Sequence, residues 1–128
     1  MGTTPPVVSE ESDTEITPQY TNPPTNVVNL ATNGTMDFQG SSTGSTLYLN
    51  NAFTGVSKIF IWCENFHSSS TLTVTLYKMN LIGTTTIGSY RFEVGTGGGT
   101  FVSGLDSSAK YYLSFSAPSN FSGYVEQN

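Results

Sequence analysis

Positive charge is scarce in this chain. Lys and Arg number 4 among 128 residues, against 9 Asp and Glu. Phosphate backbones and anionic lipid surfaces are bound through clustered Lys and Arg, so we do not expect nucleic acid as a partner. No apolar stretch approaches the roughly 20 residues that a membrane-spanning helix needs, so we also expect no membrane insertion.

Cysteine is almost absent, since Cys63 is the single one, and His67 is the single histidine. One thiol cannot form an internal disulfide, and together with one imidazole it cannot complete the ligand set of a structural zinc site. Cys63 shares its alternation phase with Ile59 and Ile61, which places it in the interior, where a thiol behaves as a small hydrophobe. We therefore predict a buried structural thiol.

Sequences of catalytic type are missing as well. The chain contains no G-x-S-x-G, H-E-x-x-H, P-loop or EF-hand pattern. The acids after residue 25 are isolated from one another in the sequence, as is usual for solvent-exposed acids at strand ends and in loops. Gly97, Gly98 and Gly99 fit a hairpin tip better than a phosphate-binding loop, because no helical pattern follows them. We predict a protein with no enzymatic activity, cofactor or metal ion.

The few charges divide the chain into two parts. Residues 1–25 hold four acids, no base and five of the six prolines, whereas the remainder has a net charge of −1. Such a Pro- and Thr-rich acidic segment cannot bury enough apolar surface to offset its ordering entropy. We predict a disordered leader or linker over 1–25, either a semi-rigid stalk or an inconsequential terminus, and a single domain over 26–128.

Helical periodicity is also lacking, and a period of two replaces it. Residues 71–77 alternate aliphatic with hydroxyl side chains, and Tyr111, Leu113 and Phe115 alternate with polar neighbours. Turn residues recur at short intervals, among them Asn33-Gly34 as a hairpin turn, Asn50-Asn51, and 95–99. The pattern predicts an all-β, antiparallel β-sandwich or jelly roll of about 8 to 10 short strands. The expected strands cover 27–31, 35–39, 46–49, 58–64, 71–77, 84–87, 90–94, 100–105, 111–116 and 121–126.

Aromatic side chains offer the best candidate for a binding site. In 58–64, the charged Lys58 and Glu64 share the phase of Phe60 and Trp62. If the charges mark the solvent side, both rings are exposed and can stack on a sugar ring. Tyr77 and Tyr112 also fall on outward phases and could extend this surface. The alternative is a central strand covered on both faces, with Trp62 in a second layer of the core, which we favour because Trp is highly buried on average.

Residues 104–115, GLDSSAKYYLSF, resemble the closing hairpin of small β-sandwich modules attached to secreted bacterial enzymes and surface proteins, including carbohydrate-binding and pre-peptidase-like domains. Few Lys and abundant Thr, Ser, Asn and Gly are also typical of secreted or cell-surface proteins. Residues 1–6 lack the regions of a signal peptide, so we expect that an export signal has been removed. Secretion without a disulfide favours a bacterial source.

These observations predict a non-catalytic extracellular binding module that recognises carbohydrate or a cell-surface protein through exposed aromatic rings. The alternative is a structural or protein-interaction module, such as a spacer or an assembly subunit, that uses exposed sheet edges or an apolar face.

Overall fold

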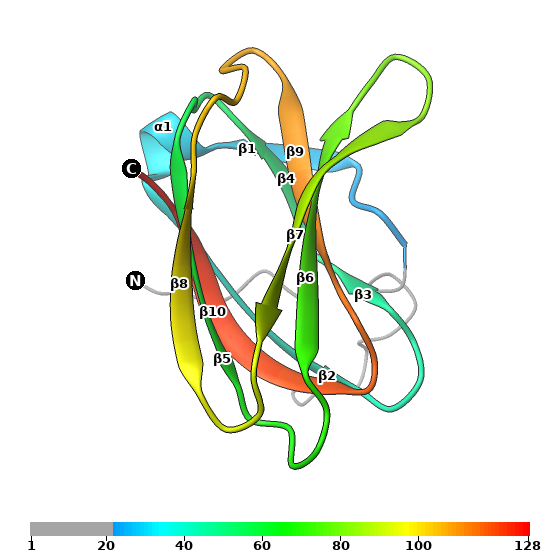
Figure 1. The fold of residues 1–128 in the computed structure, drawn as a ribbon. Coiled ribbons are helices and arrows are strands. Elements are labelled where there is room, and N and C mark those ends of the chain that lie inside the picture. The colour runs from blue at the N-terminus through cyan, green and yellow to red at the C-terminus, as the bar shows by residue number, and fades with distance from the viewer. Residues whose placement is uncertain (1–21) are drawn as a thin grey trace.

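Two β-sheets lie face to face and enclose the core (Figure 1). The structure is a computed structural model that describes residues 22–128, so most of the predicted leader lies outside the described residues. The predicted all-β sandwich is confirmed. Its strands are β1 (Asn26–Asn29), β2 (Thr35–Ser42), β3 (Leu47–Tyr48), β4 (Asn51–Thr54), β5 (Ile59–Asn65), β6 (Leu72–Met79), β7 (Thr84–Phe92), β8 (Gly97–Val102), β9 (Lys110–Phe115) and β10 (Ser119–Gln127), with one short helix, α1 (Leu30–Asn33).

The strand order is that of a jelly roll. The four-stranded sheet has the order β2-β10-β5-β8, and the six-stranded sheet has the order β1-β4-β9-β6-β7 with β3 beside β9. β3 and β4 both pair with β9 and occupy one strand position. Numbered from β2 with that position counted once, the sheets read 1-8-3-6 and 2-7-4-5, which is the double Greek key. β1 stands outside this count and pairs with β4 in parallel, unlike the antiparallel pairs we predicted.

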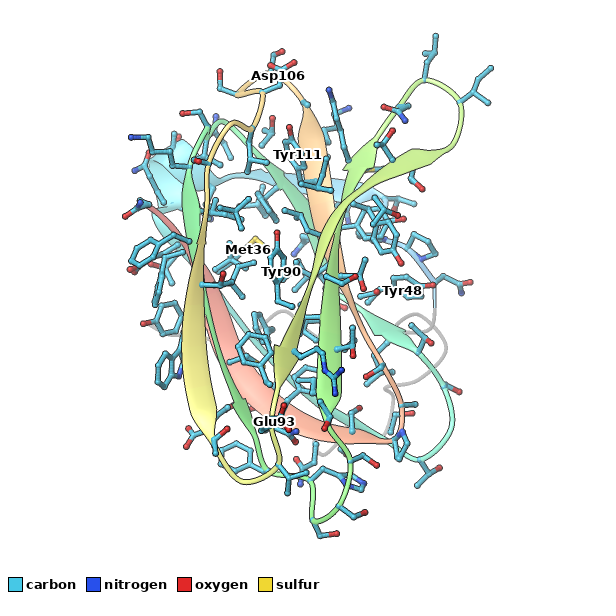
Figure 2. The ribbon with its side chains drawn as sticks, viewed as in Figure 1. Met36, Tyr48, Tyr90, Glu93, Asp106 and Tyr111 are labelled. Carbon is cyan, nitrogen blue, oxygen red and sulfur yellow. The ribbon has the colours of Figure 1, made fainter. Side chains whose placement is uncertain are left out.

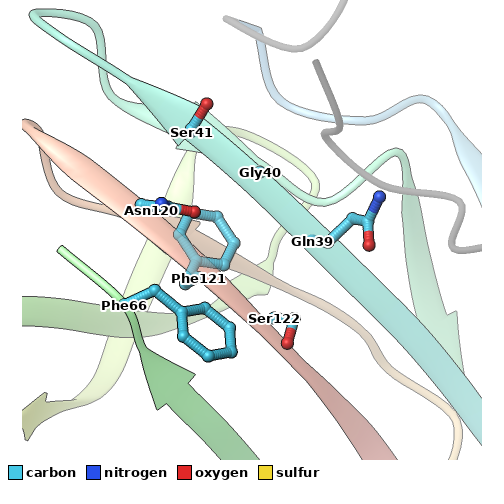
Figure 3. Close-up of a pocket in the computed structure, with 7 residues that line it drawn as sticks. All are labelled: Gln39, Gly40, Ser41, Phe66, Asn120, Phe121 and Ser122. Atoms are coloured by element: carbon cyan, nitrogen blue, oxygen red, sulfur yellow. The ribbon is translucent and has the colours of Figure 1, made fainter. Parts of the chain in front are cut away.

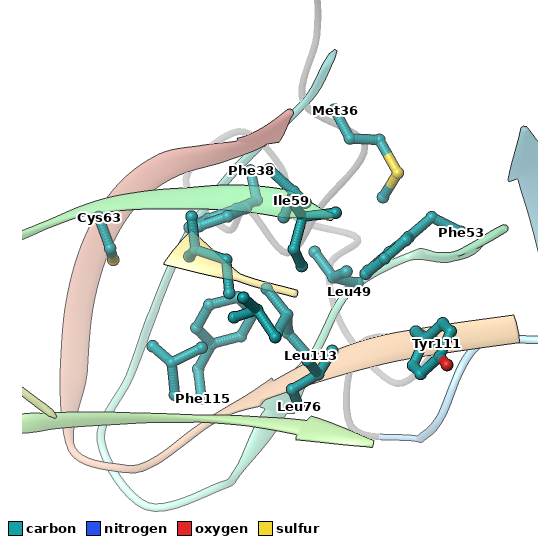
Figure 4. Packing of buried hydrophobic residues seen from close by; sticks show 14 of the residues in the cluster. Met36, Phe38, Leu49, Phe53, Ile59, Cys63, Leu76, Tyr111, Leu113 and Phe115 are labelled. Carbon is teal, nitrogen blue, oxygen red and sulfur yellow. The ribbon is translucent and has the colours of Figure 1, made fainter. Parts of the chain in front are cut away.

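The core is built by the side chains of both sheets that point inward (Figure 4). Ile59, Ile61 and Cys63 are completely buried, as their alternation predicts. The ring of Phe115 in β9 stacks on that of Phe121 in β10, with centroids 4.2 Å apart and planes inclined by 16°. Because β9 and β10 belong to different sheets, this aromatic pair joins the two layers.

One predicted hairpin turn is instead the end of a helix. Asn33-Gly34 was expected to turn a hairpin, but Gly34, at φ 83°, ends helix α1 and donates from its N–H to the Leu30 carbonyl at 2.7 Å. Asn29 caps the other end by accepting from the N–H groups of Ala31 and Thr32 at 2.9 and 3.3 Å. An Asn cap and a Gly at the end are typical of helices. Helix α1 has only one turn, which is too short to show a periodic apolar stripe in the sequence.

Three strand assignments also change. Asn51 begins β4, because it pairs with Asn26 of β1, a partner distant in the sequence. The strands expected at 84–87 and 90–94 form one strand, β7, whose pairing with β6 shifts register at Leu76/Tyr77. Gly97, Gly98 and Gly99 are the first residues of β8 and not a hairpin tip. The turn before them is closed by Thr96, whose N–H and hydroxyl both donate to the Glu93 carbonyl.

The loop from β8 to β9 is fixed to the core through Tyr111. The buried Tyr111 hydroxyl accepts from the Asp106 N–H at 2.8 Å, and Figure 2 shows Asp106 at the end of the sandwich above it. Oδ1 of Asp106 in turn accepts from the N–H and the hydroxyl of Ser108, which lower the pKa of this carboxyl.

Candidate functional site

An open row of aromatic rings lies on the outer face of the four-stranded sheet. Trp62 in the middle of β5 pairs with Tyr124 of β10 on one side and with Gly99 of β8 on the other. Phe60 pairs in the same way with Glu126 and Phe101. The neighbouring residues Ile61 and Cys63 point into the core, so these rings point away from it. We call this surface the aromatic face, defined by Phe60, Trp62, Tyr124, Phe101 and, beyond the end of β5, Phe66.

The rings of the aromatic face are partly open to solvent. Phe101 is 69% exposed and Phe66 51%, while Phe60, Trp62 and Tyr124 are half-buried. The Phe60 centroid lies 4.7 Å from that of Phe101, with planes inclined by 43°, and 6.2 Å from that of Tyr124, with planes inclined by 52°. β5 is central in its sheet, as our alternative supposed, but Trp62 is on the outer face and not in a second layer of core.

Glycines in β8 make room for two of these rings. A Cβ on Gly97 would lie 2.8 Å from Cζ2 of Trp62, and a Cβ on Gly99 would overlap Cζ of Phe60. Gly98 points the other way, and its Cβ would meet the Phe92 ring at an ordinary 3.6 Å. The two rings of β5 therefore lean over the backbone of β8, in space that any other residue at 97 or 99 would fill.

Carboxylates surround the rings. Asp37 of β2 pairs with Tyr124, Glu126 of β10 pairs with Phe60, and Glu64 lies two residues beyond Trp62 on the same side of β5. Lys58, just before β5, is the base in phase with them. Acids therefore outnumber bases on this face, and their oxygens can accept hydrogen bonds from ligand hydroxyls.

A shallow hollow of about 240 Å³ continues the aromatic face beyond the end of β5 (Figure 3). The exposed ring of Phe66 forms one side of it, and the Phe66 N–H donates to the Asn120 carbonyl at 2.7 Å. Carboxamides and hydroxyls from β2 and β10 complete the lining, so an apolar ring and polar groups meet in one place. The lining residues are Gln39, Gly40, Ser41, Phe66, Asn120, Phe121 and Ser122.

The residues on either side of Phe66 are held by a buried amide. Asn65, only 1% exposed, donates from Nδ2 to the carbonyls of Ser70 and Phe92, both at 2.9 Å, and accepts from the His67 N–H at 3.0 Å. Nδ1 of His67 accepts from the N–H groups of Ser69 and Ser70, each at 3.0 Å. The His67 side chain thus closes the serine-rich turn at 68–70.

Cys63 is a core residue, as predicted. Its side chain is fully buried, and burial, with a smaller contribution from Glu64, raises the pKa of the thiol. The thiol is therefore protonated at neutral pH and is no nucleophile in the folded protein. Within residues 22–128, no group of three or more His, Cys, Asp and Glu side chains is placed to hold a metal ion.

The other two predicted site residues lie on the opposite sheet. Tyr77 of β6 and Tyr112 of β9 stack with centroids 5.1 Å apart and planes inclined by 29°, and Tyr48 meets Tyr112 edge-on at 6.0 Å. Tyr112 is only 4% exposed, and burial, with smaller contributions from Tyr48 and Tyr77, raises its pKa. Tyr48 and Tyr77 are half-buried. These tyrosines form a separate cluster on the opposite sheet, so they cannot extend the surface of Phe60 and Trp62.

Sequence reasoning missed three members of the aromatic face: Tyr124, Phe101 and Phe66. The signal for Tyr124 was present, because it shares its alternation phase with Glu126 in the same way that Trp62 shares the phase of Glu64. The same rule could not have found Phe101, because no charged residue shares its phase in the strand expected at 100–105. Phe66 follows the end of β5, where alternation no longer assigns a side.

An exposed apolar tip was also missed. Leu81 is 99% and Ile82 89% exposed at the end of the hairpin between β6 and β7. The turn is well formed, since the Asn80 N–H donates to the Gly83 carbonyl at 3.0 Å and its Nδ2 donates to Oγ1 of Thr85 at 2.8 Å. Both side chains are thus presented to solvent by an ordered turn.

Comparison with protein-family models found no match, and neither did comparison with curated proteins. No helix in the described part of the chain is long and apolar enough to cross a membrane.

Proposed function

We propose that this protein is a non-catalytic extracellular binding module that recognises carbohydrate through the aromatic face. The observation that carries the proposal is the position of the Trp62 ring. It lies over Gly97 of the edge strand β8, and Tyr124 is its neighbour on the other side. A half-buried ring held in this way offers an apolar surface for a sugar, with acceptors for its hydroxyls from Asp37 and Glu64 nearby.

Trp62→Ala tests this proposal, with Tyr77→Ala as the matched control that removes an outward ring from the opposite sheet. We expect Trp62→Ala to weaken binding on a glycan array at least tenfold, because aromatic anchors dominate small contact surfaces. Tyr77→Ala should leave binding unchanged. Since Trp62 is the only tryptophan, ligand binding should also shift the emission of the parent protein. Equal binding by both variants would contradict the proposal.

The second candidate function is that of a protein-interaction module, and the Leu81 and Ile82 tip favours it. Two fully exposed aliphatic side chains on an ordered hairpin form a small knob that could fill an apolar pocket of another protein. Replacing both with Ser should then abolish self-association or partner binding, measured by sedimentation and by pull-down from the source organism's surface extract. Unchanged association in both assays would remove this candidate.

A further inference from the structure

We propose that the ligand of the aromatic face is a single, soluble, uncharged polysaccharide chain, bound at internal sugar units along β5. This inference depends on the proposed function and narrows it to a class of ligand. Three features of the face carry it: its length and open ends, the inclination of its rings, and its charge.

The length of the aromatic face exceeds one sugar. Phe60, Trp62, Glu64 and Phe66 follow one another along β5 and just past its end, with Phe66 beside the hollow. At about 3.3 Å per residue, these positions span roughly 20 Å, which is the length of several sugar units. The face is a sheet surface and not an enclosed pocket, so no wall requires a chain end. A linear chain can therefore lie across it and continue beyond both ends.

The inclination of the rings selects a flexible chain over a crystalline surface. A flat polymer surface needs coplanar rings, but the ring of Phe60 is inclined by 43° to Phe101 and by 52° to Tyr124. The aromatic face is therefore not flat where these three rings lie. A crystalline polymer, whose chains lie side by side in one plane, cannot lie flat on all three rings, whereas a single chain along β5 does not need to contact all three.

The charge of the face selects an uncharged chain. Asp37, Glu64 and Glu126 project among the rings, and Lys58 is the single base in phase with them. A uronate or sulfated chain would place its anions beside these three carboxylates, with Lys58 as the one cation to pair with them, which costs free energy. Hydroxyl groups, by contrast, donate to carboxylates in charge-assisted hydrogen bonds.

The test titrates the emission of Trp62 in the full chain with soluble gluco-, xylo- and manno-oligosaccharides of one to six units. Oligogalacturonates of the same lengths supply the charged counterpart, and microcrystalline cellulose and chitin supply crystalline surfaces. We expect affinity for at least one neutral series to rise at least tenfold from two to six units. The oligogalacturonates should bind at least tenfold more weakly than that series, and the crystalline polymers should retain no protein.

Variants check the role of charge. Glu64→Gln with Asp37→Asn should narrow the difference between neutral and charged hexasaccharides, whereas Asp106→Asn, in the loop at the end of the sandwich, should not. A single sugar that binds as tightly as a hexasaccharide, preference for the uronates, or binding only to crystalline polymer would overturn this inference while leaving carbohydrate recognition in place. If no glycan binds and Trp62→Ala behaves as the parent, the proposed function itself fails.

Discussion

The two outer faces of the sandwich both carry aromatic rings at outward positions, but they use them differently. On the six-stranded sheet, Tyr77 and Tyr48 cover Tyr112, which is 4% exposed. On the four-stranded sheet, the rings of Phe60 and Trp62 lean over glycines of the edge strand, and Phe101 remains 69% exposed. The outer rings of both faces are half-buried, but on the first face they cover another ring, and on the second they lie over glycines.

The difference arises from the neighbouring strand and not from the aromatic residues themselves. A cross-strand partner with a ring fills the space beside an aromatic residue, as Tyr112 does beside Tyr77. Glycines on the neighbouring strand leave that space empty. The rings can then lie diagonally across it, as Trp62 does over Gly97 and Phe60 over Gly99. Outward phase therefore predicts which way a side chain points, whereas its exposure depends on residues distant in the sequence.

The largest expected effect is a difference in the free energy of unfolding that is lost when one aromatic ring is removed from each face. Tyr112→Ala should cost about 3 kcal/mol, as truncation of a buried aromatic does, and should leave glycan binding unchanged. Trp62→Ala removes a half-buried ring and should cost about half as much. Urea denaturation of both variants measures the two losses. Equal losses would show that the faces do not differ in packing.

The next prediction compares two glycines of β8, one that lies under a ring and one that does not. Gly99→Ala places a methyl group where Phe60 lies, so the ring must move, and we expect glycan affinity to fall about tenfold, or roughly 1.4 kcal/mol. Gly98→Ala is the matched control, because its methyl group would meet Phe92 at an ordinary 3.6 Å. If both variants bind alike in the Trp62 emission titration, the glycines do not position the rings.

The smallest effect concerns Cys63, which adjoins Trp62 but faces the core. Burial raises its pKa above the ordinary 9.0, so the folded state keeps the proton more tightly than the unfolded state. This contribution to stability is complete below pH 9 and falls as the pH rises; for a single group with an unfolded pKa of 9.0 the loss by pH 9.5 is about 0.8 kcal/mol.

Denaturation of the parent and of Cys63→Ala at pH 7 and pH 9.5 isolates this loss, since the tyrosines contribute equally to both proteins. A parent that loses no more stability than the variant would mean that water reaches the thiol. The inner side of β5 would then be as open as the side that carries Trp62.

Alternation was enough to predict the sandwich and most of its interior. Ile59, Ile61, Cys63, Leu113 and Phe115 are all fully buried, because a period of two leaves a strand only one way to face a core. The same rule put Phe60 and Trp62 on the outward phase, where they lie, although we favoured a second layer of core over Trp62. It was wrong where long-range pairing decides the structure, as with the pairing of Asn51 with Asn26, and where glycine serves a strand instead of a turn, as at Gly97 and Gly99.

The candidate site was less predictable than the fold for the same reason. Phase grouped Tyr77 and Tyr112 with Trp62, but phase is defined within a strand and does not state which sheet the strand joins. Tyr124 lies beside Trp62 through a register between β5 and β10, which are far apart in the chain. No local pattern encodes that neighbour.

The glycines beneath the rings also affect how β8 remains attached to the sheet. β8 is an edge strand, and glycine is among the weakest formers of strands. The rings of Trp62 and Phe60 cover its backbone and supply the cross-strand contact that its missing side chains do not. These rings thus clasp the edge of the sheet as well as forming the aromatic face, so amide protons of β8 should exchange faster when a ring is removed and more slowly when a ligand holds it down.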